Sequence, residues 1–580
     1  MANTRIIFKQ YFFLDNGGVI LGHEIINNKF RELFLPSLLI AMALNITAIV
    51  DSMFVSSFVG HNALAAIQLL EPIVLLITVF EWLFGLGGQI LSLNKKAEFD
   101  EDGSNRYFTV ALFSTLLICI IILVVCFVDY RGLLSLLNPH NDVLPYLKQY
   151  APFLFLTFPI STILGVISQY VRVDGQPNLA SFTIIVANVI NIILDYVFLE
   201  HLHMGIQGAS LATLIGYTIG LIIIFKYFFD SKRTFKFNFK IRVKNWFSSF
   251  WDIIKIGFPT ASMGIFDLVF IHIMNQLISV NLGTLGLNAF TLCQDGFLII
   301  SIIVVGFAET IASIVPIYYS QYDYRNLNYI MKQAFIVSTV CGAIFAGIML
   351  FAPNLFLMLY NYNGLSSTAF MINALKIYSP LFIFTVFTTI LIFYYEAIER
   401  ATASALLSIL STFALPLVFV FALFPTLSSN AFWVCMPLGA IISVLITFIY
   451  VKFIERREKE YHGIFLIKKD LIPKTQNYIL KSRNDENKTK LFNHLNDLNV
   501  NKKYCEALDK IVNNIYDANS ENIVVELVII DYDNKINIDI KDEGKSNILE
   551  DIKNDLSLGD DLKYTKVLGL NDTNLIITKN

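Results

Sequence analysis

The sequence predicts an all-α polytopic membrane protein, with about twelve transmembrane helices in two six-helix lobes, followed by a small soluble α/β domain of the α+β sandwich kind. The chain of 580 residues is 55% hydrophobic and contains 50 phenylalanines, which excludes a soluble protein of this length. Apolar runs of about twenty residues, each long enough to cross roughly 30 Å of hydrocarbon, recur from Leu33 to Lys452. After Arg456 the composition becomes polar, and apolar and polar residues alternate as in strands.

Composition divides the chain into five parts. Residues 1–30 are expected to form an N-terminal cytoplasmic or interfacial segment, without the apolar core of a cleavable signal peptide. Residues 31–245 form the first lobe with its basic loop, and residues 246–455 form the second lobe. A polar linker at 456–487 leads to a cytoplasmic domain at 488–580.

The apolar runs define the expected spans, six in each lobe. They are Leu33–Val59, Leu69–Leu93, Phe108–Val128, Leu147–Val171, Leu179–Leu199, Ile206–Phe228, Ile253–Val280, Leu287–Tyr318, Tyr329–Ala352, Phe370–Ile398, Ala403–Phe424 and Ala431–Ile454. The two halves repeat, because an offset of 223 residues places Pro36 on Pro259 and Gly60 on Gly283. Two six-span halves that share one direction form a parallel repeat about an axis along the membrane normal.

Loop charges predict the orientation. Basic residues follow the even-numbered spans, above all in the loop with Lys232, Arg233 and Lys236, and are scarce after the odd-numbered spans. The positive-inside rule then places both termini in the cytoplasm of a plasma (inner) membrane. We interpret the basic loop as this signal and not as a nucleic-acid patch. The six cysteines are scattered, and no spacing indicates a metal site or a disulfide framework.

The polar residues of the first lobe are the candidate binding residues. An ionised carboxylate near the bilayer centre costs at least about 2.5 kcal/mol, so it persists where it faces a cavity or a partner. The oxygen-bearing side chains here could take up a proton or ligate a hard cation such as Na+. A structural hydrogen-bond network between spans is the alternative. The candidates are Asp51, Asn188, Asn191, Asp195 and Thr213.

The second lobe has fewer polar residues in its spans. Asp267, between Phe266 and Phe270, is a candidate to line a substrate cavity and meet a cationic compound. Glu81 and Glu309 lie deep within apolar runs and are further cavity candidates.

The membrane domain, about residues 30–455, resembles the MATE (multidrug and toxic compound extrusion) family. The likeness lies in "ITAIVDSMFV", "GHNALAA", "YVRVDGQPNLASF", "NVINIILDYVF", "MGIQGASLATLIGY", "IGFPTASM" and "VVGFAETIASIVPIYYSQ". It implies a central cavity open alternately to each side, and export of organic, usually cationic and amphipathic compounds in exchange for H+ or Na+. The family's cation-site residues carry onto Asp51, Asn191, Asp195 and Thr213, whereas a seventh-span glutamate of the family is replaced by Asp267 in that region.

The tail, about residues 490–580, resembles the GHKL (histidine-kinase-type) ATPase fold, especially its anti-sigma-factor-like branch. A helix, "CEALDKIVNNIYDAN", precedes the expected strands "NIVVELVIID", "KINIDIKDEG" and "NLIITK". The resemblance implies ATP and Mg2+ binding at Glu506, Asp542 and Gly544. Lys510 stands where that family has an asparagine, so we expect a degenerate domain without ATP hydrolysis that regulates the protein or binds a partner.

The expected function is secondary antiport rather than enzymatic catalysis, with no cofactor required beyond the coupling ion. Small organic substrates and the lipid bilayer are the expected partners of a monomer, with a nucleotide or a regulatory protein open as a partner of the tail. A flippase-like transporter of lipid-linked precursors is one alternative, and it would favour a basic cavity. A membrane sensor with an ATP-binding output domain is another, and it would need an intact nucleotide site.

Overall fold

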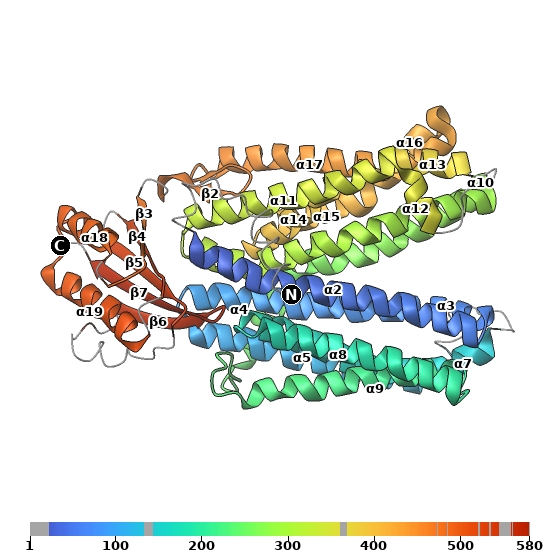
Figure 1. Cartoon of the computed structure of the whole chain (residues 1–580), viewed down its shortest axis with the longest axis horizontal. Helices are drawn as coiled ribbons and strands as arrows, with labels where there is room; N and C mark the ends of the chain where they lie inside the picture. Colours follow the sequence, from blue (N-terminus) through green and yellow to red (C-terminus); the bar gives the residue numbers. More distant parts are fainter. Residues whose placement is uncertain are drawn as a thin grey trace.

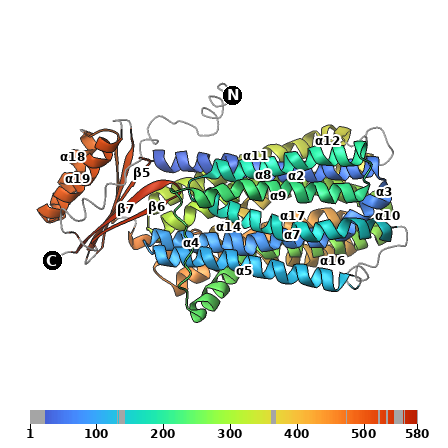
Figure 2. The same cartoon turned by 90° about the horizontal axis from the view of Figure 1, so that it is seen from below.

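The protein is a long bundle of helices with a small sheet domain at one end (Figure 1). This computed structural model describes residues 23–130, 132, 143–359, 368–471, 474–483, 485–519, 523–532, 535–544, 558 and 561–578. Most of the expected N-terminal segment, residues 1–22, lies outside this range. We call the end of the bundle that carries the sheet domain the tail side, and the opposite end the far side (Figures 1 and 2).

Apolar segments of the first half form one lobe. Asp100 caps α5 by accepting the amide of Gly103, and a proline stands in the first turn of both α7 and α8. The elements are α2 (Glu24–Phe58), α3 (His61–Phe80), η1 (Glu81–Leu86), α4 (Gly87–Ala97), α5 (Glu101–Val128), α7 (Leu144–Val173), α8 (Pro177–Tyr196), η2 (Val197–His201), α9 (Ile206–Ile224) and η3 (Phe225–Phe229).

The second half forms the other lobe. Its first element, α10, is two helices that meet at Gly283, where φ is +63°. The elements are α10 (Val243–Ser320), α11 (Tyr324–Phe351), α12 (Pro353–Leu359), α13 (Thr368–Tyr378), α14 (Leu381–Ala397), α15 (Ala401–Ile409), η4 (Leu410–Ala414), α16 (Leu415–Leu427), η5 (Ser428–Asn430) and α17 (Ala431–Arg457).

The repeat expected from Pro36/Pro259 and Gly60/Gly283 is also visible in backbone conformation. Gly60 and Gly283 both have positive φ and sit at the turn between the first two helices of each lobe. At the same offset, Asp323 caps α11 by accepting the amide of Asn326, as Asp100 does for α5. The same turn conformation and the same helix cap thus recur 223 residues apart, which supports a structural repeat of the two lobes.

Ten helices of the described chain are long and apolar enough to cross a membrane. The last of them, Ala401–Arg457, contains two crossings, because the chain turns back at Ser428 and α16 packs against α17. The continuous helical run from α3 through α4 forms one more crossing by its length and apolar sequence. The described helices therefore accommodate the expected twelve spans.

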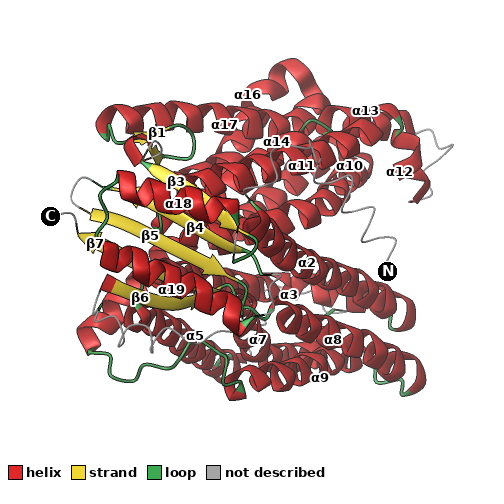
Figure 3. Ribbon diagram, turned by 60° about the vertical axis from the view of Figure 1, so that its left-hand side comes forward, coloured by secondary structure: helices red, strands yellow, loops and turns green. Residues whose placement is uncertain are grey.

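The tail domain (β3 to β7, Thr475–Thr578) is a five-stranded antiparallel sheet with strand order β3-β4-β5-β7-β6. Two helices cover its outer face, so the sheet lies between them and the bundle (Figures 1 and 3). Residues 456–487, expected to be a linker, contribute β3, and the sheet therefore begins before residue 488. The elements are β1 (Tyr461–His462), β2 (Ile467–Lys468), η6 (Lys469–Leu471), β3 (Thr475–Leu480), α18 (Glu486–Asp497), α19 (Lys502–Ala518), β4 (Val525–Asp531), β5 (Lys535–Asp542), β6 (Leu562–Val567) and β7 (Leu570–Thr578).

Candidate cation site in the first lobe

Two carboxylates of the first lobe come together where α2 packs against α8. Asp195 of α8 is fully buried, and Asp51 of α2 is close enough for its charge to act on Asp195. Neither oxygen of Asp195 has a hydrogen-bond partner in the described chain, and the same holds for Oδ1 of Asp51. A buried carboxylate without a donor is costly as an anion, so this site favours a bound proton or cation.

Neutral polar groups flank this pair from the next helix. The Asn191 amide donates to the Thr213 hydroxyl of α9 at 3.2 Å, and Thr213 donates to the carbonyl of Ala209. Gly216 allows this approach of α8 and α9, because a Cβ there would lie 2.5 Å from the carbonyl oxygen of Ala187. The Asn191 side chain also lies close enough to act on Asp195 as a donor, so it links the carboxylate pair to Thr213.

Asn188 has a different role from Asn191. Its amide donates to the carbonyl of Ile184 within α8 at 2.8 Å. The side chain is buried, one turn before Asn191 along the helix. This bond supports the helix locally.

The backbone departs from α-helix next to two of the acids. A π-helical turn, η2, begins two residues after Asp195, and another, η1, begins at Glu81. Such turns are rare and are found often at functional sites, because the extra residue redirects side chains. Gly165 of α7 leaves room for the Glu81 carboxyl, since a Cβ at that position would lie 2.4 Å from Glu81 Cδ.

The oxygen atoms at the Asp51–Asp195 pair suit a hard cation. Carboxylate, amide and hydroxyl oxygens are the ligand types that such ions prefer. The oxygens of Asp195, which have no hydrogen-bond partner in the described chain, can bind either a proton or Na+. The described residues contain no group of three or more His, Cys, Asp or Glu side chains that could hold a transition metal.

The other cavity candidates lie in two separate places. Phe266 stacks on Phe413 with ring centroids 5.7 Å apart, and Asp267 beside it is partly buried. Phe270 is fully buried in the hydrophobic core and does not line an open surface in this conformation. Glu309 forms an ion pair with Arg172 across the two lobes, and Glu81 lies close enough for both of these charges to act on it. The structure thus brings Glu81 and Glu309 together at Arg172 and leaves Asp267 apart from them.

Sequence reasoning missed Glu396 of α14. This acid is fully buried, accepts a hydrogen bond from the Thr260 hydroxyl, and its Oε1 has no partner in the described chain. Thr260 lies at the repeat position of Ser37, which accepts from the buried Arg172 in the first lobe. Glu396 was overlooked because it ends an apolar run next to Glu399 and Arg400, where an acid resembles a membrane-edge residue.

Within the described part of the tail, the candidates do not form one open pocket. Glu506 is exposed and pairs with Lys502 at 3.8 Å. Asp542 is buried and accepts from the Gly544 amide at 2.7 Å and from the Asn571 side chain at 2.9 Å.

An acid and an asparagine four residues apart do occur on α19, one turn after Glu506. Asn513 donates to Asp509 at 2.9 Å, and the Lys488 ammonium contacts Asp509 at 2.7 Å. Residues 545–557, which follow the Asp-x-Gly segment, lie outside the described chain. The spacing of Asp509 and Asn513 is visible in the sequence and is the signal that points to this pair.

Comparison with known proteins agrees with the fold. The MatE family model matches residues 36–197, which contain most of the first-lobe site. A multidrug export protein, MepA, of Staphylococcus haemolyticus is 25% identical over 284 residues, covering 48% of this chain and 62% of that protein. MepA of Staphylococcus aureus (strain MSSA476) is 21% identical over 231 residues, covering 40% of this chain and 51% of that protein. The chain thus spans about half to three fifths of these curated relatives.

Solved structures match over a longer part of the chain. A crystal structure of MATE in the bent conformation superposes with a TM-score of 0.67 at 20% identity, covering 75% of this chain and 96% of that chain. A MOP superfamily transporter from Pyrococcus furiosus, described as having a binding pocket of reverse polarity, gives a TM-score of 0.65 at 20% identity over 74% and 96%. At this identity the match establishes the fold of the membrane domain.

Proposed function

We propose that this chain is a secondary transporter of the MATE kind that exports small organic compounds, cationic and amphipathic, in exchange for H+ or Na+; the family match over residues 36–197 and the shared fold support this. The observation that carries the proposal is the buried carboxylate of Asp195, which lies beside Asp51, has the Asn191 side chain as a neighbouring donor, and makes no complete hydrogen bond in the described chain. An uncompensated acid at this depth is retained where an ion must bind and leave.

The coupling follows from charge. A proton or Na+ at Asp51 and Asp195 neutralises the first lobe and changes how α2 packs against α8. A cationic compound and the ion are drawn by the same negative field, so binding of one disfavours the other. Each ligand shifts the equilibrium between the two open states only by its difference in affinity for them. Competition at one site makes the exchange obligatory.

We place the tail side in the cytoplasm of the cell membrane. The basic loop before α10 and the charged ends of α17 lie on this side, in accord with the positive-inside rule. In the structure the lobes are joined on this side by hydrogen bonds from Gln89 to Ser313 and from Asn94 to Glu399. The tail side of the bundle is therefore closed in this structure.

The rivals explain these features less well. A flippase for pyrophosphate-linked lipids needs several free basic groups in its cavity, but the buried Arg172 is paired with Glu309. A sensor with an ATP-binding output domain needs an open nucleotide site, but Asp542 is already bonded to Asn571 and Gly544.

The test is efflux of ethidium and norfloxacin from cells without their own pumps, under imposed H+ or Na+ gradients. The intact chain is expected to export a probe under one gradient, and Asp195→Asn is expected to abolish this while the protein stays in the membrane. Glu98→Gln is the matched control, because Glu98 is a surface acid of the same lobe that pairs with Lys95. Efflux that persists in Asp195→Asn would overturn the assignment of the site.

A further inference from the structure

The two faces of the tail sheet have different partners. Ile536, Ile538 and Ile540 of β5 point toward α18 and α19 and form the core of the tail domain. The alternate residues Asp539 and Lys541 point to the other face, toward the bundle, and each is only 1% exposed. A polar sheet face normally stays in water, so its burial indicates a specific docked surface.

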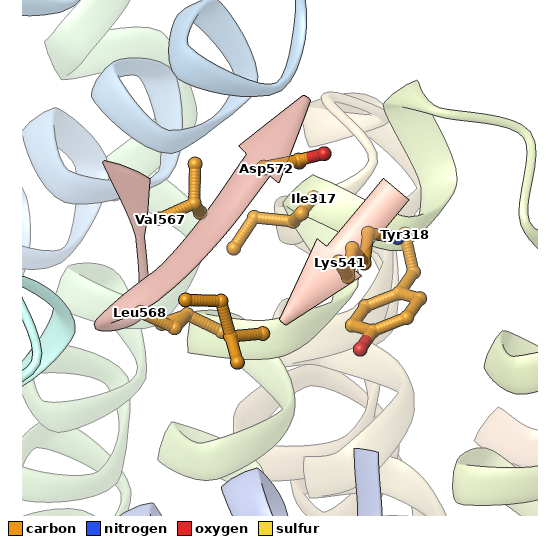
Figure 4. A pocket seen from close by; sticks show the side chains of 7 residues that line it. Ile317, Tyr318, Lys541, Val567, Leu568 and Asp572 are labelled. Atoms are coloured by element: carbon orange, nitrogen blue, oxygen red, sulfur yellow. The ribbon is translucent and has the colours of Figure 1, made fainter. Parts of the chain in front are cut away.

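Lys541 is at the centre of this surface. Its ammonium lies 3.8 Å from Asp323 and 4.2 Å above the ring of Tyr318, both at the tail-side end of α10 and α11. Figure 4 shows Lys541 of β5 beside the Tyr318 ring, with Asp572 of β7 and Ile317 around the same small pocket. A buried ammonium is stable only among groups that compensate its charge, and the membrane domain supplies them.

The second lobe makes further contacts with the tail at the α10–α11 turn. Gln321 donates to Asp572 of β7, and Asn326 donates to Glu526 of β4 at 2.5 Å. Both pairs are buried, so the loss of either partner would leave an unsatisfied polar group.

The first lobe contacts the same domain through the β6–β7 hairpin. A Cβ on Gly175, in the α7–α8 turn, would lie 2.7 Å from Cα of Gly569 at the hairpin tip. The neighbouring Leu568 belongs to the hydrophobic core of the membrane domain and not to that of the tail. Lys29 of α2 adds a contact of 3.9 Å to Glu543. The tail domain therefore binds both lobes at once.

Opening of the tail side would separate these two sets of contacts. The lobes must also break Gln89–Ser313 and the Arg172–Glu309 ion pair on this side before a cavity can open. A rigid sheet held by Gly175 in one lobe and by Gln321 in the other resists that movement. The sheet can keep its contacts with both lobes only while the tail-side ends of the lobes remain close to each other.

We propose that the tail domain is a clamp: it docks across both lobes, holds the tail side closed, and must release at least one lobe before the cavity can open there. This clamp regulates the proposed transport and rests on that function for its biological role. The closure itself is testable without any substrate, because it concerns only access to the tail-side interface.

The test measures maleimide labelling of Ser313→Cys in the full chain, with the six native cysteines replaced. Ser313 is buried between the lobes, so its labelling rate reports tail-side opening. Lys541→Glu places a carboxylate among Asp323, Glu526 and Asp572, and Gln321→Glu faces Asp572 without any change in the tail sequence. Both are expected to raise the labelling rate several-fold.

Two controls accompany these variants. Lys535→Glu makes the same charge change at the exposed start of β5 and is expected to leave labelling unchanged. Gln321→Glu combined with Asp572→Asn exchanges amide and carboxylate across the interface and is expected to return labelling to the parent rate.

The outcomes separate the clamp from the transport proposal. Labelling that stays at the parent rate in both Lys541→Glu and Gln321→Glu overturns the clamp. Faster labelling supports it, and faster efflux of ethidium in the same variants supports regulation of transport. Faster labelling in a chain that exports no probe under either gradient keeps the clamp and counts against the proposed function.

Discussion

Arg172 of the first lobe donates to Glu309 of the second lobe, and this ion pair is buried on the tail side of the bundle. The same guanidinium donates to Ser37 at 2.9 Å and to Gln169, so both of its terminal nitrogens are bonded between α2, α7 and α10. This ion pair fixes the two lobes relative to each other, whereas apolar contacts alone would allow the lobes to slide past one another.

Removal of one member is expected to destabilise the closed protein. Glu309→Gln leaves a buried, unpaired guanidinium, which costs about 3–5 kcal/mol. Thermal unfolding in detergent should show a clear fall in Tm, and Arg172→Met/Glu309→Met should recover much of it. Loss of the pair Arg400–Glu458, whose side chains are 28% and 36% exposed, should cost no more than about 1 kcal/mol. Equal effects at the two pairs would contradict this role for Arg172.

The hydrogen bond between Asn191 and Thr213 is expected to tune ion binding. Thr213→Val removes the acceptor, which costs about 1 kcal/mol, a factor of about five in an equilibrium constant. The concentration of the coupling ion that half-saturates efflux should rise by that factor, whereas Thr213→Ser should restore the parent value. A parent-like response of Thr213→Val would show that the hydroxyl plays no part in the site.

Close packing of α8 on α9 is expected to tolerate no side chain at Gly216. A methyl group there would meet the Ala187 carbonyl at 2.5 Å, so Gly216→Ala should lower Tm and transport together. Gly347 of α11 has open space around its would-be Cβ, and Gly347→Ala should be neutral or stabilising by up to about 1 kcal/mol. A stable, active Gly216→Ala would mean that the helices can separate without loss.

The sequence predicts the membrane fold well because the length of each apolar run and the glycines at the turns determine each helix from nearby residues alone. Asp51 and Asp195 stand out in the sequence because an acid inside an apolar run is costly unless it faces a cavity or a partner. Other features depend on contacts between distant segments: Glu309 was assigned to a cavity because its partner Arg172 lies in the other lobe. Likewise, β3 was placed in a linker because its pairing with β4 brings together residues far apart in the chain.

Docking of the tail is expected to weaken as pH rises through about 7. Burial, followed by the charge of Asp323, raises the pKa of Glu526 from 4.5 to about 7. Burial, followed by the charge of Asp572, raises the pKa of Asp539 from 3.8 to about 7. Lys541 and Arg325 oppose these shifts, and Asn326 and Asn574 donate to the two carboxyls.

The sign follows from linkage. An acid whose pKa is raised in the docked state contributes stability that is fully present below its ordinary pKa and is lost as pH rises through the raised value. The labelling rate of Ser313→Cys, divided by that of the exposed Lys535→Cys to remove the intrinsic pH dependence of the thiol, should therefore be higher at about pH 8 than at about pH 6. Glu526→Gln with Asp539→Asn should flatten this profile, since amides do not titrate. A profile that stays steep in the double variant would assign the pH dependence to other groups, among them Asp572, whose pKa burial also raises.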